Sequence, residues 1–232
     1  MTEFAELKKK EASCRTKTLA DPHLKVLCAL IENGLSIMQS GAKKRVKNNS
    51  DAIAFILVWN FHQLNAAYTS TLNGNYVAAI SNIRSSFEGN MFIHKYSRDK
   101  EAGEKWMNNL DYESDRIHAI AKELTKKDAK QFSEYYTHYR NLSQLAHPYP
   151  KMRFLFSRQD GENTIVSLGG EYRKKWAGVL LSEILFSINS GLKEAKTTTA
   201  LGATENQITE FETNFNLTTP SLFKYFAELK EE

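Results

Sequence analysis

Arg140, Asn141 and His147 form the pattern in this sequence whose residue types and spacing are best suited to chemistry. If the segment is helical, the seven-residue step from Arg140 to His147 turns the chain by about 700°, which is about 20° short of two full turns. The same step moves the chain about 10 Å along the helix axis. Arg140 and His147 then share one face, where a guanidinium can hold an anion and an imidazole can transfer a proton near neutral pH. Pro148 disfavours helical angles at His147, so we expect the imidazole at a helix C-terminus, where the dipole favours its protonated form.

A helix over residues 128–146 must position this pattern. Its apolar residues repeat by three and four, which predicts one buried stripe. The stripe consists of Phe132, Tyr135, Tyr139, Leu142 and Leu145. Tyr136 and Ser143 fall on the neighbouring face with Arg140 and His147, so we expect them to support the two site residues. We expect Arg140 and His147 to be at least partly exposed on one side of the protein.

Apolar periodicity and helix-end signals predict further helices before and after this one. They cover residues 22–41, 51–72, 76–96, a short stretch within 97–109, then 110–124 and 171–191. Asp21 is expected to cap the first of them, with Pro22 at its first helical position. Asn73, Gly74 and Asn75 predict a tight turn in which Asn75 caps the next helix, so that two long helices run antiparallel.

A change of period predicts a small β-hairpin near residues 152–168. Met152, Phe154 and Phe156 alternate with other residues, and Asp160 and Gly161 are typical of a turn. A threonine-rich linker and two short C-terminal helices follow within 197–232, the last with Thr219 as N-cap and Pro220 at its first position. We therefore predict a mainly α protein: a charged lead-in over 1–20, and an antiparallel helical bundle over 21–196 on which the C-terminal helices pack.

Composition narrows the class of protein. The chain has 232 residues, of which 41% are hydrophobic, with only 4 Pro and 11 Gly, which favours a folded helical protein over an all-β one. Cys14 and Cys28 have no spacing typical of a disulfide framework or a zinc site, which favours a reducing compartment. The charged N-terminus does not resemble a signal peptide, and the longest apolar run, Ala52–Trp59, is too short to span a bilayer. We expect a cytoplasmic protein without a membrane anchor or a cofactor.

Two alternatives to the Arg-His pattern involve carboxylates. Asp115 with His118, and Glu134 with His138, could place a carboxylate beside an imidazole, as in metal-binding bundles. Such bundles need two Glu-x-x-His pairs and two further glutamates, so solvated helix faces explain these residues better than a metal site does.

At the Arg-His pattern the chain resembles the HEPN superfamily (higher eukaryotes and prokaryotes nucleotide-binding), whose members carry motifs of this kind, an Arg followed by a polar residue and, after four to six residues in all, a His, on a late helix of an α-helical bundle. The LNGN turn, the segment from Arg84 to Glu88 and the LSQLAHP ending look similar to prokaryotic members of that group. The resemblance covers about residues 50–150. It implies a homodimer in which two motifs form a composite cleft for metal-independent cleavage of RNA.

The resemblance assigns a role to each residue of the motif. Arg140 would contact the scissile phosphate, His147 would move the proton, and Asn141 would orient one or the other. Arg173, Lys174 and Lys175 form one of several basic clusters that could follow an RNA backbone, although solvated helix ends are the simpler explanation of such clusters. A toxin or defence component, with an antitoxin protein as partner, is the biological role that this resemblance suggests.

A structural interpretation of the same residues stays open. Arg140 would then pair with an acidic side chain such as Glu88, and His147 would cap a helix. Glu88 follows Arg84 by four residues, so an ion pair within one helix is its simplest role and a supporting contact to Arg140 is the second. The alternative function is a non-catalytic helical module that binds a nucleic acid, a nucleotide or a protein partner.

Overall fold

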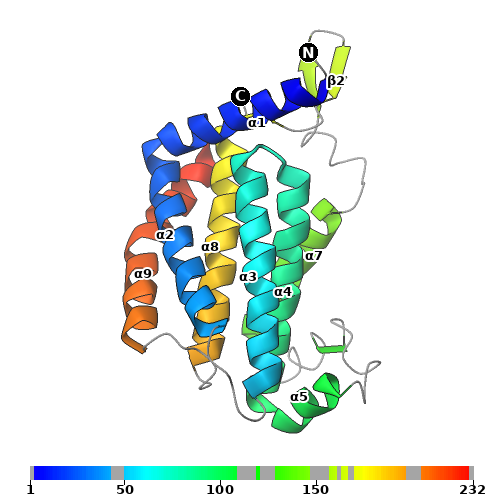
Figure 1. Ribbon diagram of the computed structural model, residues 1–232, viewed down its shortest axis with the longest axis vertical. Coiled ribbons are helices and arrows are strands. Elements are labelled where there is room, and N and C mark those ends of the chain that lie inside the picture. The colour runs from blue at the N-terminus through cyan, green and yellow to red at the C-terminus, as the bar shows by residue number, and fades with distance from the viewer. Residues whose placement is uncertain are drawn as a thin grey trace.

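A computed structural model describes residues 3–42, 50–108, 119–120, 129–146, 157–160, 163–166, 170–196 and 205–229. Over these residues the protein is mainly helical, as predicted (Figure 1). The helices are α1 (Glu3–Ala20), α2 (Pro22–Ala42), α3 (Ser50–Leu72), α4 (Tyr76–Arg98), α5 (Lys100–Met107), α7 (Ala129–Ala146), α8 (Lys174–Lys196) and α9 (Glu205–Glu228). Two short strands, β1 (Ser157–Asp160) and β2 (Asn163–Val166), pair antiparallel with Ser157 opposite Val166.

The helices α3 and α4 form an antiparallel pair that runs the length of the bundle (Figure 1). Gly74 turns the chain between them with a φ of 73°, which glycine adopts without the steric cost that a side chain brings. Asn75 occupies the N-cap position of α4, but its side chain makes no capping hydrogen bond. Its Nδ2 instead donates to Oε1 of Glu11 at 2.9 Å, so Asn75 links the turn to α1.

The start of α2 follows the predicted capping pattern. Oδ1 of Asp21 accepts hydrogen bonds from the backbone N–H groups of His23 and Leu24 at 2.9 and 3.1 Å. The preceding residues, expected only as a charged lead-in, form α1, which lies across one end of the bundle (Figure 1). Its buried residues are Glu11, Cys14 and Thr18, and their spacing of three and four places them on one narrow face toward the bundle.

The core is organised around α8, which packs against α2, α3, α4 and α9 (Figure 1). Ile184, Leu185, Ile188 and Leu192 of this helix are fully buried. These four positions lie within one arc of about 100°, and buried Ser187 and Asn189 extend the buried surface on either side of it, which suits a helix with several neighbours.

A buried polar chain joins α3, α4 and α8. Nδ2 of Asn60 donates to Oδ1 of Asn90 at 2.8 Å, and Nδ2 of Asn90 donates to the carbonyl of Ser187 at 2.9 Å. The hydroxyl groups of Ser187 and Ser86 lie 2.7 Å apart and share a hydrogen bond. Gly89 leaves the space that Asn60 occupies, because a Cβ at that position would overlap its amide.

The C-terminal region differs from the prediction. The two short helices expected there are one continuous helix, α9, with Pro220 inside it. Thr219 does not cap a helix: its hydroxyl donates to the carbonyl of Phe215 one turn earlier, at 2.7 Å. Phe215, Leu222 and Phe226 are buried on both sides of the proline, and this continuous apolar face holds the two halves together despite the missing backbone donor.

Several predicted segments fall outside the described residues. They are the first strand of the hairpin at 152–156, the linker at 197–204 and nearly all of the helix at 110–124. The other helices are present with ends shifted by a few residues; α8, for example, begins at Lys174 rather than Glu171.

Candidate functional site

The C-terminal half of α7 displays the predicted site residues on the outside of the bundle. Tyr139 and Leu142 are each 3% exposed and anchor this part of the helix. Arg140 and Asn141 lie between them in sequence and are both exposed, because successive helical residues point about 100° apart. The expected exposure of Arg140 is thus confirmed, and its guanidinium is accessible to a ligand.

Glu88 of α4 has partners other than Arg140. Its Oε1 accepts hydrogen bonds from Nη2 of Arg84 at 2.9 Å and from the Tyr139 hydroxyl at 3.0 Å. The Arg84 guanidinium also lies 5.7 Å from the centre of the Tyr139 ring. The ion pair within one helix, predicted as the simplest role of Glu88, is confirmed, and it fixes Tyr139, the neighbour of Arg140.

Arg140 itself has no ion-pair partner among the side chains that the structure describes. Ser143, predicted to support the site, is half-buried, and its Oγ is buried without a hydrogen-bond partner. The side chain of Tyr136 lies outside the described part of the chain, as does His147. The helix ends at Ala146, directly before His147 in sequence, so the relative placement of Arg140 and His147 stays a prediction.

Two members of the predicted RNA-binding cluster at the start of α8 are engaged in ion pairs. Nη2 of Arg173 lies 2.8 Å from Glu171, and Nζ of Lys174 lies 2.7 Å from Asp21. Hydrogen bonds to Asp21 and Tyr225 raise the pKa of Lys174 above its usual value. Lys175 is half-buried. Arg173 and Lys174 thus tie the start of α8 to its surroundings, and a role for the cluster in binding RNA stays a prediction.

His138 makes a contact that sequence reasoning missed. Its Nε2 lies 2.6 Å from Oε2 of Glu183 on α8, and its ring packs against those of Phe87 and Phe186, with centroid distances of 5.0 and 6.3 Å. Burial favours the neutral imidazole, but the hydrogen bond and the charge of Glu183 outweigh burial and raise the pKa of His138. The bond to Glu183 therefore favours the protonated form of the imidazole.

Metal ligands do not gather in the described part of the chain: no group of three or more His, Cys, Asp or Glu side chains is placed to hold an ion there. Of the carboxylate and imidazole residues considered for a metal, Asp115, His118 and the side chain of Glu134 lie outside the described residues. Cys14 and Cys28 are buried free thiols, and burial raises the pKa of Cys28 to about 11. Such a thiol is a poor nucleophile at neutral pH.

No family model matches this chain. Curated proteins and solved structures likewise give no significant match. The resemblance to the HEPN superfamily therefore stays a prediction carried by the motif residues. Among the described helices, none is long and apolar enough to cross a membrane.

The signal that could have located the His138 and Glu183 pair is weak in the sequence. The partners are 45 residues apart, so helical spacing within one segment cannot connect them. Arg140 and Asn141, by contrast, are adjacent on one helix. Both lie outside its apolar stripe, so their exposure can be predicted from the sequence. The chemistry available at α7 is an exposed cation and an amide on an anchored helix, next in sequence to a histidine that lies outside the described residues.

Proposed function

We propose that this protein is a HEPN-like, metal-independent endoribonuclease that acts as a homodimer, with its active site at the C-terminal end of α7. One observation carries the proposal: Arg140 is exposed, next to exposed Asn141, and no described acidic side chain neutralises it. An arginine held in this way by its helix is suited to bind a phosphate through its fork of donors.

The anchoring of α7 supports the proposal. Tyr139 is fixed by Glu88 and Arg84 of α4, so the backbone of the following residue has a defined position on the bundle. Fixed donors stabilise developing charge better than mobile ones, because no reorganisation is needed at the moment of reaction. Glu88 thus serves the site indirectly, through Tyr139 rather than by contact with Arg140. Ser143 and Tyr136 complete the proposed support on the same helix.

The proposed reaction uses the substrate's own 2′-hydroxyl as the nucleophile. The 2′-oxygen forms a bond to phosphorus while the bond from phosphorus to the 5′-oxygen breaks, which leaves a 2′,3′-cyclic phosphate and a 5′-hydroxyl. The 2′-hydroxyl gives its proton to a base, and the 5′-oxygen receives one from an acid. Arg140 binds the non-bridging oxygens, on which negative charge builds, and Asn141 orients the phosphate or the imidazole.

A homodimer is part of this proposal because one imidazole cannot be base and acid in the same step. Two copies of His147, one from each protomer, would divide the two proton transfers between them across a shared cleft. The β1 and β2 region, within the hairpin predicted near 152–168, follows His147 in sequence, and we propose that it borders this cleft. A toxin or defence role with an antitoxin partner belongs to the same proposal, as does a cytoplasmic location.

The test is cleavage of a fluorescent RNA by the purified protein in excess chelator. We expect Arg140→Ala and His147→Ala each to reduce the rate by at least about a hundredfold, because each removes one group that acts in the transition state. The melting temperature of Arg140→Ala should stay close to that of the wild type, since Arg140 is exposed.

Arg15→Ala on α1 and His62→Ala on α3 are matched controls, because both residues are exposed and remote in sequence from the motif. They should leave the rate unchanged. Equal cleavage by the wild type and both motif variants would identify a contaminating nuclease and refute the proposal. RNA that binds without being cut would favour the non-catalytic module instead.

A further inference from the structure

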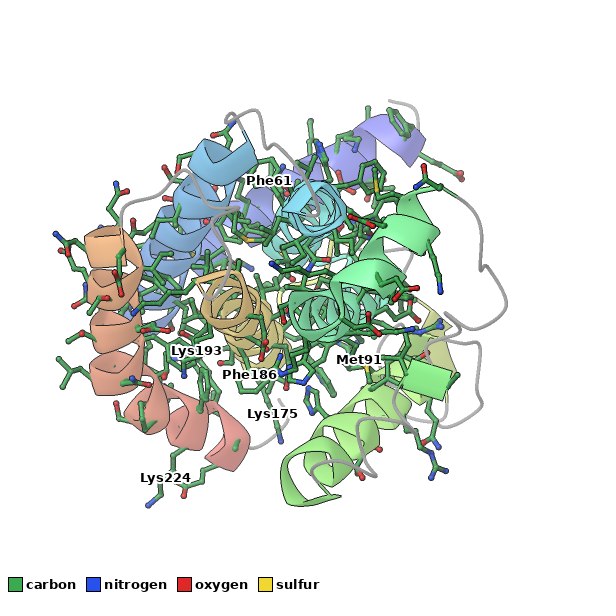
Figure 2. The ribbon with its side chains drawn as sticks, turned by 90° about the horizontal axis from the view of Figure 1, so that it is seen from below. Phe61, Met91, Lys175, Phe186, Lys193 and Lys224 are labelled. Atoms are coloured by element: carbon green, nitrogen blue, oxygen red, sulfur yellow. The ribbon has the colours of Figure 1, made fainter. Side chains whose placement is uncertain are left out.

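The helix α3 lies at the edge of the bundle, with one side turned away from the core. Figure 1 shows it between α2 and α4 at the front of the view, and Figure 2 shows it end-on, with Phe61 labelled on the flank toward α2. Along the outer side, exposed residues recur in steps of four and three: Phe55, Trp59, His62, Ala66 and Thr69. This spacing keeps them in one stripe, about 21 Å long, with the repeat of the seam between two coiled helices.

Two large aromatic side chains lie at one end of this α3 stripe. Phe55 is 56% exposed and Trp59 is 49% exposed, although folded proteins bury most of the surface of such rings. The Phe55 ring contacts that of Trp106 on α5 at a centroid distance of 5.9 Å, and Trp106 packs in turn on Tyr96 at 5.7 Å. Phe55 is therefore held in its exposed position, as a preformed anchor for a partner would be.

The α3 stripe also lacks charged residues. No Lys, Arg, Asp or Glu occurs from Ala52 to Leu72, whereas the outer sides of α1 and α9 carry exposed charges such as Lys9 and Glu210. A partner that recognises charge has nothing to pair with on this stripe. Two copies of the stripe, by contrast, can meet without bringing like charges together, a juxtaposition that would oppose association.

The sizes of the side chains favour a second copy of the chain as the occupant. Bulky Phe55 and Trp59 lie at one end of the stripe, and the smaller Ala66 and Thr69 lie at the other. A two-fold axis across the middle of the stripe reverses the second helix, so that each large residue of one copy faces a small residue of the other. The same axis position pairs Trp59 with Ala66 and Phe55 with Thr69. Large side chains opposite small ones let two helices approach closely and interdigitate.

We propose that the α3 stripe binds the same stripe of a second copy of this chain, with the two helices antiparallel. Trp59 of each copy packs over Ala66 of the other, and Phe55 packs over Thr69. A contact between two helices is smaller than the roughly 800 Å² per partner of stable complexes, so we expect a dissociation constant in the micromolar range.

This contact goes beyond the proposed ribonuclease. The motif residues belong to α7, which packs on α4, and none of them lies on α3. A chain that uses both the α3 stripe and a cleft at the end of α7 would form a tetramer with two kinds of two-fold contact. The experiments on α3 use no RNA, so their outcome does not depend on whether the protein cleaves it.

A pair of charged substitutions tests the antiparallel pairing. Sedimentation equilibrium of the full-length protein, from about 1 μM to 1 mM, measures self-association. Trp59→Lys removes an aromatic anchor and Ala66→Glu buries a carboxylate, so each variant alone should raise the dissociation constant at least about tenfold. An equal mixture of the two should return to within about threefold of the wild type, because it combines one lysine–glutamate pair with one native pair of Trp59 and Ala66.

A change of size tests the same pairing without charge. Ala66→Trp adds apolar surface, which would strengthen binding to an unrelated apolar partner. Against a second α3 stripe it places two large rings opposite each other, so self-association should weaken about tenfold. The double variant Trp59→Ala with Ala66→Trp exchanges the large and small positions and should associate like the wild type.

Val26→Lys is the matched control, since Val26 is a 41% exposed apolar residue of α2. It should leave the dissociation constant unchanged, and all the variants should keep melting temperatures close to that of the wild type because the substituted residues are exposed. The proposal fails if the wild type stays monomeric up to 1 mM, or if Trp59→Lys associates as well as the wild type, which would place the contact elsewhere. A mixture of the charged variants that associates no better than either alone would overturn the antiparallel pairing.

Discussion

Two regions of the bundle differ in how they treat buried polar side chains. One is the end of the bundle under α1, and the other is the side of α8 that faces α7 and α9. Under α1, Glu11 is 8% exposed and accepts hydrogen bonds from Lys8 at 2.7 Å and Asn75 at 2.9 Å. On the α8 side, Asn189 is about as deeply buried, yet its Oδ1 has no partner. Nearly all buried polar groups of a folded protein have hydrogen-bond partners, so Glu11 follows this rule and Oδ1 of Asn189 is an exception to it.

The satisfied end is a joint between distant segments. Nδ2 of Asn75 reaches α1, and the Tyr76 hydroxyl accepts from the backbone N–H of Arg173 at 2.9 Å. Gly74 lies against the backbone of Glu171 in the same place. The unsatisfied side instead combines an open cavity with Asn189 and Lys193. Complete pairing is thus a feature of the joint under α1, whereas a buried acceptor without a partner lies in the wall of the cavity beside α8.

The largest change in the free energy of unfolding is expected from a substitution at the joint under α1. Gly74→Ala places a Cβ 2.7 Å from the carbonyl oxygen of Glu171, at a φ of 73° that side chains avoid. The overlap is with backbone, which cannot rotate away. We expect a loss of about 3 kcal/mol in the free energy of unfolding, from the combined cost of the left-handed conformation and the overlap. Urea denaturation followed by circular dichroism measures it.

Gly103→Ala on α5 is the control for that experiment. A Cβ there would lie 3.4 Å or more from its neighbours, which is ordinary contact. Because alanine is a better helix former than glycine, the variant should be stabilised by up to about 1 kcal/mol. Equal effects of the two substitutions would show that the joint at Gly74 is not tightly packed, and the contrast between the regions would weaken.

Sequence reasoning located this turn but not its partners. Asn73, Gly74 and Asn75 are consecutive, and local backbone preferences were enough to predict the reversal between α3 and α4. The bond from Asn75 to Glu11 spans 64 residues, and no local pattern encodes it. The same limit explains Pro220: its local preference is for a helix start, but the apolar face that continues past it packs on α8 and keeps α9 whole.

At the candidate site, too, local features could be predicted from the sequence and contacts between distant segments could not. The ion pair of Arg84 with Glu88 and the exposure of Arg140 follow from helical periodicity, which the sequence displays. The pair of His138 with Glu183, and the cavity beside it, arise where three helices meet. Tertiary packing alone sets that geometry, so the sequence could suggest which residues titrate but not which of them meet.

A smaller change in the free energy of unfolding is expected from substituting two serines, one with a hydrogen-bonded hydroxyl and one with an unpaired hydroxyl. Ser187 is fully buried and its hydroxyl bonds with Ser86 at 2.7 Å and Asn90 at 3.1 Å, whereas the buried Oγ of Ser143 has no partner. Ser187→Ala should lower the free energy of unfolding by about 1 to 2 kcal/mol, because it leaves buried partners unpaired. Ser143→Ala should change it by no more than about 0.5 kcal/mol.

Thermal and urea unfolding of both serine variants, measured side by side, decide this comparison. A large destabilisation by Ser143→Ala would mean that its hydroxyl is satisfied in solution, and the contrast between paired and unpaired groups would not hold on α7. A neutral Ser187→Ala would show instead that the buried chain of Asn60, Asn90 and Ser187 adds little to stability.

The smallest effect is a difference in pH dependence between the two regions. Hydrogen bonds from Lys8 and Asn75 lower the pKa of Glu11, so its contribution to stability is present above the unfolded value of about 4.3 and lost as the pH falls through the folded value. For His138, burial opposes the charge, but Glu183 raises the pKa. Its contribution is therefore complete below the unfolded value of about 6.5 and lost as the pH rises through the folded value.

Thermal unfolding of the wild type, Glu11→Gln and His138→Gln from pH 3 to pH 9 separates these contributions. The melting temperature of Glu11→Gln should fall furthest below that of the wild type at neutral pH and approach it in acid. That of His138→Gln should fall furthest below in mild acid and approach it in alkali, while exposed His62→Gln should follow the wild type throughout. If the His138 variant differs from the wild type by the same amount at every pH, its imidazole contributes through packing against Phe87 and Phe186 rather than through charge. Of the two regions, only the end under α1 would then owe part of its stability to a titrating group.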